Sequence, residues 1–259
     1  MATRLPNLQV TKSPTAGVSG IGENSWHLEI PANASRRYRL AQLDDHGSLS
    51  RKDFHWQPLC RLNLQARVSA QRIPGTWGFG FWNEPFSFLL SSSRLIPRLP
   101  ALPDAAWFFH ASPQNHLSFR DDLPASGFLA ATFSSKRIPF AMLALASPVL
   151  LLALLPATTQ AVRKLLRRMI RQDASLIHTD VTEWHEYNLE WTTKHARFSL
   201  DGVEILRTDI TPCGPLSLVM WIDNQFAAMP PNRSLRYGTL PNPAPAWMEI
   251  RGLSLSESG

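Results

Sequence analysis

Two titratable side chains stand out as candidates for chemistry in this 259-residue sequence. Glu84 directly follows the aromatic stretch GTWGFGFWN at 75–83, and His110 is the only titratable group in AAWFFHASP at 105–113. A carboxylate and an imidazole that converge can exchange protons with a substrate, which makes Glu84 and His110 candidate catalytic residues. The alternative for His110 is a purely structural histidine in the core.

A second group of residues has the composition of a binding surface. Trp221 is followed by Asp223 and Asn224, and Trp82 is followed by Asn83 and Glu84. An aromatic ring beside amide and carboxylate groups suits a saccharide, because the sugar stacks on the ring while polar groups hydrogen-bond its hydroxyls. The same residue types also occur at ordinary sheet edges, so both interpretations stay open.

The glycines of the stretch at 76–82 alternate with aromatic residues. In a strand, the aromatic residues at 77, 79 and 81 share one face, and Gly78, Gly80 and Trp82 share the other. Glycine inside a strand marks close approach by a ligand or a bulky neighbour, such as the segment 138–162. We therefore predict a ligand-binding set made of Gly78, Gly80, Trp82, Asn83, Glu84, Trp221, Asp223 and Asn224.

Composition excludes several other kinds of site. The sequence has no zinc-ligand spacing and no Gly-Lys-Ser/Thr phosphate loop, and Asp121-Asp122 alone is not a calcium motif. We therefore predict no metal, no cofactor and no nucleic acid. The net charge of +6 suits either solubility or attraction to anionic headgroups. The N-terminus lacks the apolar run of a secretory signal, so we expect a cytoplasmic protein.

The spacing of apolar residues predicts an all-β protein. In CRLNLQARV at 60–68, apolar and polar residues alternate, which is typical of a half-buried strand. At 196–208, Asp201-Gly202 supplies the positive φ angles of a hairpin turn. About ten such short segments predict an antiparallel sandwich. We expect one domain over 25–259, preceded by an N-terminal tail or short first strand at 1–24.

A helical insertion at about 136–175 interrupts the strand pattern. Residues 138–162 carry no charge, and the next segment predicts an amphipathic helix with a basic face made of Arg163, Lys164, Arg167, Arg168 and Arg171. Three prolines in the uncharged run argue against a membrane span. Three interpretations remain: a lid over a groove, a contact with an anionic membrane surface, and a satellite core.

The segment DVTEWHEYNLEWTTKHARFSLDGVEIL at 180–206 resembles laminarinase-like glycoside hydrolases of family 16, in the concanavalin A-like lectin/glucanase superfamily. The residues that match are Trp184, His185, Tyr187, Glu190, Trp191, Asp201, Gly202 and Val203. GTWGFGFW, LSLVMWIDN and AWMEIRGLSL are similar to other strands of that family, in the same order. The resemblance implies a jelly-roll sandwich whose concave sheet forms a ligand groove.

The sequence departs from that family at its catalytic strand. Those hydrolases carry Glu-x-Asp-x-Glu where this chain has AAWFFHASP, which contains no carboxylate. Our first hypothesis is therefore non-hydrolytic binding of a saccharide or glycolipid on the concave sheet, at a membrane surface. The second is an enzyme, a hydrolase or proton-transfer catalyst, acting on an apolar small molecule in a lid-covered groove. The third is a peripheral protein of the inner membrane face without small-molecule function.

Overall fold

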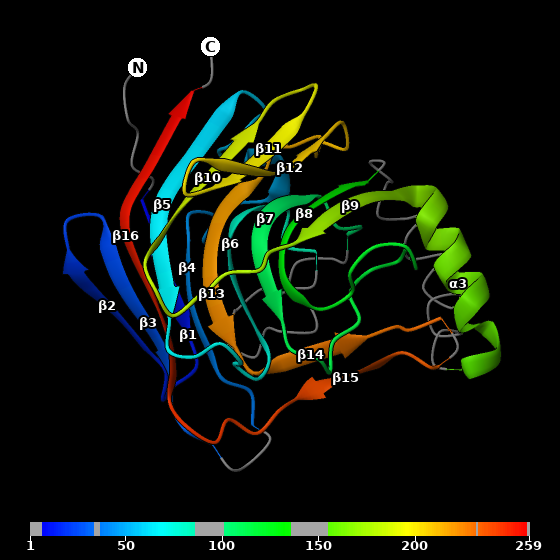
Figure 1. The fold of residues 1–259 in the computed structure, drawn as a ribbon, viewed down its shortest axis with the longest axis horizontal. Coiled ribbons are helices and arrows are strands. Elements are labelled where there is room, and N and C mark those ends of the chain that lie inside the picture. The colour runs from blue at the N-terminus through cyan, green and yellow to red at the C-terminus, as the bar shows by residue number, and fades with distance from the viewer. Residues whose placement is uncertain (1–6, 34–36, 86–100, 136–154, 232, 258–259) are drawn as a thin grey trace.

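A computed structural model describes residues 7–33, 37–85, 101–135, 155–231 and 233–257 of the chain. Within these ranges, two large sheets lie face to face, accompanied by a two-stranded ribbon (Figure 1). Neighbouring strands of all three sheets pair antiparallel. The prediction of an all-β antiparallel sandwich is confirmed.

The sheet that carries the glycine-rich strand has the order β1-β4-β13-β6-β7-β8-β9. It bends toward the helix α3, Pro156–Met169, and we call it the concave sheet (Figure 1). Its strands are β1 (Gln9–Lys12), β4 (Leu40–Asp44), β13 (Ser217–Asp223), β6 (Thr76–Trp82), β7 (Ala105–Ala111), β8 (Gly127–Ser135) and β9 (Ile170–Leu176).

The second sheet covers the convex side and has the order β12-β11-β10-β5-β16-β3-β2. Its strands are β12 (Val203–Thr208), β11 (Ala196–Leu200), β10 (His185–Trp191), β5 (Cys60–Val68), β16 (Ala246–Glu257), β3 (Ser25–Ile30) and β2 (Gly17–Gly22). The ribbon pairs β14 (Gln225–Ala228) with β15 (Arg236–Thr239), and a 3₁₀ turn, η1, covers Arg51–Asp53.

Side chains from the facing surfaces of the two sheets form the main core. On β5, Leu62, Leu64 and Ala66 are buried while the residues between them are half-exposed, as the alternation predicts. The predicted hairpin is confirmed at β11–β12, where Asp201 and Gly202 have φ angles of 49° and 79°. Both central residues therefore adopt the left-handed conformation of a tight hairpin turn.

Two segments differ from expectation. The segment 1–24, expected to be a tail or a short first strand, contains two strands, β1 and β2, which pair with β4 and β3 at the edges of the two sheets. In the predicted insertion, α3 ends at Met169 and residues 170–176 form β9, because this part of the chain pairs with β8. The segment 136–154, which holds most of the uncharged run, lies outside the described residues.

Candidate functional site

Strand β6 divides its side chains between the two faces as its sequence predicts. Trp77, Phe79 and Phe81 enter the core between the sheets, whereas Trp82 lies on the concave face. On that face the glycines give room to neighbours, since a Cβ on Gly80 would lie 2.6 Å from the Cα of Trp107. The expected close approach is therefore made by protein groups.

Gly78 makes the same kind of room for an indole ring. A Cβ there would lie 2.9 Å from the ring of Trp221 and 2.4 Å from the carbonyl oxygen of Phe108. Contacts this short would force a backbone shift, so glycine is required for Trp221 to lie flat across the sheet. The two glycines shape the floor of the concave face, and Trp221 and β7 fill the space that they leave.

Four rings from three neighbouring strands make up this floor. We call Trp82, Trp107, Phe109 and Trp221 the aromatic floor; each is 6–7% exposed. Trp82 and Trp221 are nearly parallel, at 6° and 6.0 Å between centroids, and Trp107 lies 5.5 Å from Trp221. Sequence reasoning missed Trp107 and Phe109 because the burial of both faces of β7 leaves no periodic signal.

The indole N–H groups of the floor differ in their partners. Trp221 donates from Nε1 to Oγ1 of Thr76 at 3.0 Å. The Nε1 atoms of Trp82 and Trp107 are buried and have no hydrogen-bond acceptor among the described residues. Leaving a buried donor without an acceptor costs about 1–3 kcal/mol. The floor therefore offers two hydrogen-bond donors that an added ligand could satisfy.

A buried cluster of ionisable side chains adjoins the Trp82 end of the floor. His46 lies between two carboxylates, with Nδ1 3.3 Å from Oδ1 of Asp44 and Nε2 3.3 Å from Oε2 of Glu84. We call these three residues the Asp44–His46–Glu84 cluster. The His46 ring centroid is 6.3 Å from that of Trp82. Carboxylates bridged by an imidazole can store and move a proton beside the floor.

The backbone of Glu84 is in an unusual conformation. Its φ angle is 49°, in the left-handed region that few residues other than glycine adopt. Arg51 holds this segment by donating from Nε to the carbonyl of Asn83 at 2.6 Å and from Nη2 to that of Glu84 at 2.7 Å. Strained residues held by their surroundings are concentrated at functional sites.

Asp44 and His46 were not identified as site residues from the sequence. They belong to LDDHG at 43–47, which spans the end of β4 and the residues after it, and this cluster of ionisable residues at a strand end was the available signal. Asp44 also accepts hydrogen bonds from Gln42 Nε2 at 2.8 Å and from the backbone of Gly47 at 3.0 Å. Asp44 and Glu84 both contact His46 because β4 and β6 lie on either side of β13. Only the fold shows this strand order.

Three predicted ligand residues instead hold the framework. Asp223 accepts hydrogen bonds from Thr76, and burial raises the pKa of its carboxyl to about 6. Asn224 is fully buried and bonds to the backbone at residues 37, 39 and 240. Asn83 links β6 to β7 through Leu102 and Asp104. Each of these three side chains therefore has a structural role, and ligand binding at these positions remains a prediction.

The acid/base pair expected from Glu84 and His110 is not formed. His110 lies on the core-facing side of β7, stacked on Trp77, which is its register partner. Glu84 lies beyond the other end of β6, past Trp82, and Trp77 and Trp82 are about 17 Å apart along the strand. The structure pairs Glu84 with His46 and separates it from His110.

No protein-family model matches this sequence, and no curated protein sequence matches it. Solved structures resemble it in shape. The apo Crh5 transglycosylase superposes with a TM-score of 0.50 at 10% identity, over 100% of this chain and 82% of the other. LamAcat from Zobellia galactanivorans superposes with a TM-score of 0.48 at 13% identity, covering 91% of this chain and 80% of the other.

A legume lectin-like domain from Entamoeba histolytica gives a TM-score of 0.47 at 10% identity, covering 98% of this chain and 91% of that domain. The chain has a concanavalin A-like fold. At these identities the resemblance establishes the arrangement of the two sheets and leaves the activity to be argued from the residues.

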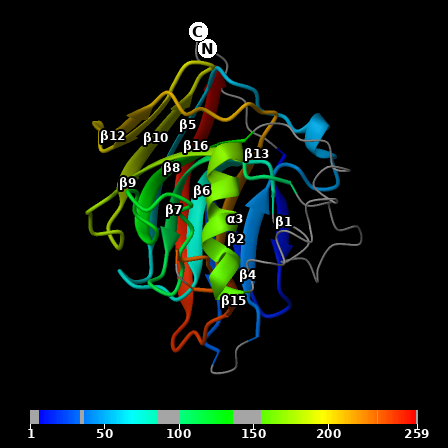
Figure 2. The same ribbon diagram turned by 90° about the vertical axis from the view of Figure 1, so that its right-hand side faces the viewer.

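Helix α3 lies over the concave side of this concanavalin A-like sandwich (Figure 2). Val162 and Leu166 belong to the same apolar cluster as the aromatic floor. Arg163, which we predicted at a membrane surface, is only 2% exposed and donates to the carbonyls of Ser118 at 2.8 Å and Met229 at 2.5 Å. The prediction is wrong for Arg163, which anchors α3 to the sandwich.

The other basic residues of the predicted membrane surface remain accessible. Lys164, Arg167, Arg168 and Arg171 are exposed; Arg167 pairs with Asp121, and Arg171 lies 3.2 Å from Asp209. Membrane contact through these residues remains a prediction. Within the described residues, no helix has the length and apolar character needed to cross a membrane.

The described residues contain no group of three or more His, Cys, Asp or Glu side chains arranged to hold a metal ion. In the Asp44–His46–Glu84 cluster, the two carboxylates lie at different nitrogens of one ring and do not converge on a common point. Asp121, weighed earlier as part of a calcium motif, pairs with Arg163 at 2.6 Å.

Proposed function

We propose that the protein binds a saccharide on the concave sheet, over the aromatic floor. The observation that carries this proposal is the pair of buried indole N–H donors on Trp82 and Trp107, which have no acceptor in the described residues. Hydroxyl oxygens of a sugar accept such hydrogen bonds, and the C–H faces of a sugar ring stack on indole.

The donors favour a saccharide, alone or as the head of a glycolipid, over an apolar small molecule. An apolar ligand would cover the rings and leave both N–H groups unpaired, so it would add no compensation for their burial. Trp82 and Trp221 are nearly parallel but only 6–7% exposed, so the proposal requires the ligand to displace part of what covers these rings. Aromatic surface and hydrogen-bond donors together support a polyhydroxylated ligand.

The binding is proposed to be non-hydrolytic. A retaining glycosidase needs two carboxyl groups about 5–5.5 Å apart across the scissile bond. The sequence resemblance aligns strand β7 with the catalytic strand of family 16 hydrolases, and β7 presents Trp107 and Phe109 toward the concave face and carries no acid. If that alignment holds, aromatic rings stand where those hydrolases carry carboxylates, which supports the proposal.

Substitution of the floor tests this proposal. Screening on a glycan array, followed by calorimetry with the best ligand, should show binding that falls about tenfold in both Trp82→Phe and Trp107→Phe, since each loses one hydrogen bond and part of a ring. Trp77→Phe is the matched control, because its indole N–H is also buried and unpaired but faces the core between the sheets. If no glycan binds, or if the control loses as much affinity, the proposal is wrong.

A second candidate function rests on the Asp44–His46–Glu84 cluster. Its buried proton-exchanging groups lie beside the floor, and Glu84 is held in a left-handed backbone conformation. These features favour acid/base chemistry on the bound saccharide. Any turnover found with the best ligand should fall at least about 100-fold in Glu84→Gln, with binding retained. Turnover that survives this change excludes the cluster as the catalyst.

A further inference from the structure

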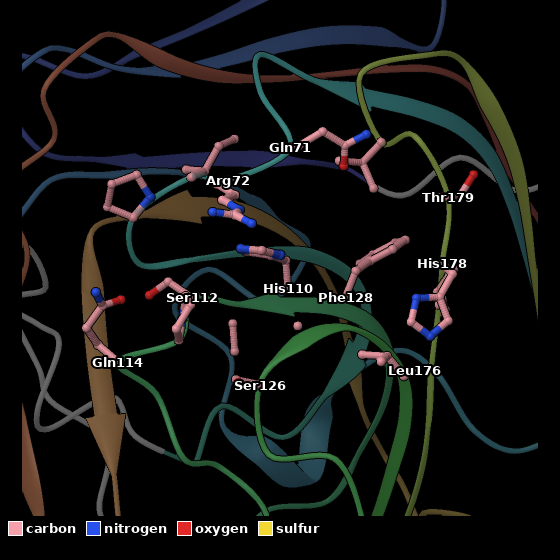
Figure 3. A pocket seen from close by; sticks show the side chains of 17 residues that line it. Gln71, Arg72, His110, Ser112, Gln114, Ser126, Phe128, Leu176, His178 and Thr179 are labelled. Carbon is pink, nitrogen blue, oxygen red and sulfur yellow. The ribbon is translucent and has the colours of Figure 1, made fainter.

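A pocket opens at one end of the sandwich, away from the aromatic floor. Its volume is about 820 Å³, and it lies between the loop from β5 to β6, the adjoining ends of β7 and β8, and the segment that follows β9. Figure 3 shows His110 and Phe128 on its inner wall, with Arg72 and His178 nearer the outside. We propose that this pocket binds a small hydroxylated anion.

The inner wall contains a buried polar atom that has no partner among the described residues. His110 is 8% exposed, and its Nε2 is buried without a hydrogen-bond partner in the part of the chain that the structure describes. Within this proposal the proton of the neutral ring is assigned to Nδ1, which leaves the lone pair on the unpartnered Nε2. Burial lowers the pKa of His110 to about 4, and a hydrogen bond with the backbone of Ile73 opposes this shift. At neutral pH the inner wall therefore presents an acceptor, which fits a ligand hydroxyl.

The rings around His110 fix the direction of this acceptor. The imidazole stacks on Trp77 with the ring planes 9° apart and centroids 5.4 Å apart. Trp77 in turn stacks on Phe128 at 4.8 Å. A side chain packed this closely has little rotational freedom, so the acceptor is already in place before a ligand arrives.

Charge at the outer part of the pocket selects the sign of the ligand. Arg72 is exposed and has no ion-pair or hydrogen-bond partner among the described residues. None of the residues that line the pocket is an Asp or a Glu. The nearby Asp180 carboxylate accepts hydrogen bonds from Gln71 and Thr182. An exposed guanidinium above an acid-free pocket attracts a carboxylate or a phosphate.

The two features together define the ligand class. A hydroxyl donates to His110 in the interior while an anionic group meets Arg72 near the opening. Sugar acids and sugar phosphates both combine these groups, so we use D-glucuronate and D-glucose 6-phosphate as probes, with D-glucose as the neutral counterpart. The inference is independent of the concave site, because no residue of the aromatic floor lines this pocket.

Calorimetry and imidazole ¹⁵N NMR on the full chain test the inference. At least one anion should bind more tightly than D-glucose and shift the His110 Nε2 resonance. Arg72→Gln should weaken this binding about tenfold, and His110→Phe, which keeps a stacked ring but removes the acceptor, should do the same. Arg207→Gln, an exposed arginine of β12, is the matched control and should bind as the unmodified protein does.

The relative affinity of D-glucuronate and D-glucose 6-phosphate shows whether the pocket prefers a carboxylate or a phosphate, and a preference for either supports the inference. Because His110→Phe alters a buried position, the NMR shift and the exposed Arg72→Gln variant keep the test valid if that protein does not fold. Trp82→Phe should leave anion binding unchanged, which separates this site from the saccharide site. The inference is overturned if neither anion moves the Nε2 resonance, if D-glucose binds as tightly, or if Arg72→Gln has no effect.

Discussion

Buried acids lie at both ends of the concave sheet, and their ionisation links stability to pH. Burial raises the pKa of Asp45 and of Asp223 from 3.8 to about 6. Their hydrogen bonds, from Trp56 and Leu218 to Asp45 and from Thr76 and Gln225 to Asp223, act in the opposite direction without cancelling the effect of burial. In the folded protein these two groups therefore hold their protons more tightly than in the unfolded chain.

Replacing Asp223 by Asn should remove one part of this pH dependence. Because the folded-state pKa is raised, the stability that Asp223 contributes is fully present below pH 3.8 and is lost as the pH rises through about 6. The free energy of unfolding of the unmodified protein should therefore fall, relative to Asp223→Asn, by roughly 2 kcal/mol between pH 4 and pH 7. Urea unfolding at several pH values measures this difference.

Asp209→Asn is the control for the Asp223 experiment, since Asp209 is an exposed carboxylate whose side chain is 83% accessible. The free energy of unfolding of Asp209→Asn should differ from that of the unmodified protein by nearly the same amount at every pH in this range. His110 works against Asp223 in the total pH profile, because its lowered pKa makes the folded state more stable as the pH rises from about 4 to 6.5. For this reason the prediction concerns the difference between the two proteins. A constant difference across the range would contradict it.

At the scale of single residues, the sequence predicts which face a side chain occupies better than it predicts partners. The alternation at 76–82 correctly separates Trp82 from Trp77. Asp44 and Glu84 are 40 positions apart, and their shared contact with His46 depends on β13 lying between β4 and β6. Strand order sets such contacts, and local patterns contain no information about it.

Strand β6 should tolerate no side chain at Gly80. A Cβ there would lie 2.5–2.7 Å from Ala106 and Trp107, and the φ angle of 149° disfavours any residue with a Cβ. Gly80→Ala should lower the free energy of unfolding by about 2–4 kcal/mol, because β7 must move away from β6. Gly17→Ala in β2, whose added Cβ would be 3.9 Å from Glu29, should cost less than about 1 kcal/mol. Equal losses in urea unfolding would contradict this account.

Helix α3 should depend on Arg163 for its attachment. The guanidinium donates to three backbone carbonyls and to Asp121, so Arg163→Met leaves these acceptors without their donor. We expect a loss of about 2–3 kcal/mol in the free energy of unfolding and faster protease cleavage within α3. Arg168→Met, on the exposed side of the same helix, is the matched control. If the two variants are cleaved at the same rate, Arg163 is not the anchor.

The sequence predicts elements well where the pattern is local. The half-buried strand at 60–68 and the Asp201-Gly202 turn are both found, because alternation and turn residues determine them directly. The end of α3 at Met169 was not predicted, since the helical spacing continues through Ile170. Pairing of 170–176 with β8 overrides that spacing, and such tertiary contacts are absent from the helical pattern.

For the whole molecule, the regular spacing of strands predicted an antiparallel sandwich, and the resemblance of its ordered motifs to family 16 hydrolases implied the concanavalin A-like form that is found. The shape of the concave site was not predictable in the same way. A ligand groove on the concave sheet was expected, whereas Trp82 and Trp221 are almost fully buried and α3 lies over that side. A long apolar and basic insertion cannot reveal from its composition which surface it covers.

The whole-molecule charge of +6 leads to the last prediction, which concerns anionic membranes. Because Arg163 is buried and Arg167 pairs with Asp121, the exposed basic residues of α3 without an ion pair among the described residues are Lys164 and Arg168, while Arg171 in β9 lies near Asp209. Each cation near an anionic surface adds about 1 kcal/mol of attraction. Vesicles that contain phosphatidylserine should therefore bind the protein, neutral vesicles should not, and salt should weaken the binding.

The double variant Lys164→Gln/Arg168→Gln should lower this partitioning at least about tenfold, as expected for the loss of two such contacts. Arg207→Gln/Arg236→Gln is the matched control, because it removes the same charge from exposed positions on β12 and β15. If the binding face is local, only the Lys164→Gln/Arg168→Gln variant should lose vesicle binding, because screening over about 10 Å confines the attraction to charges near the membrane surface. Equal losses in both double variants would mean that net charge alone drives the binding, and no binding of the intact protein would remove the membrane hypothesis.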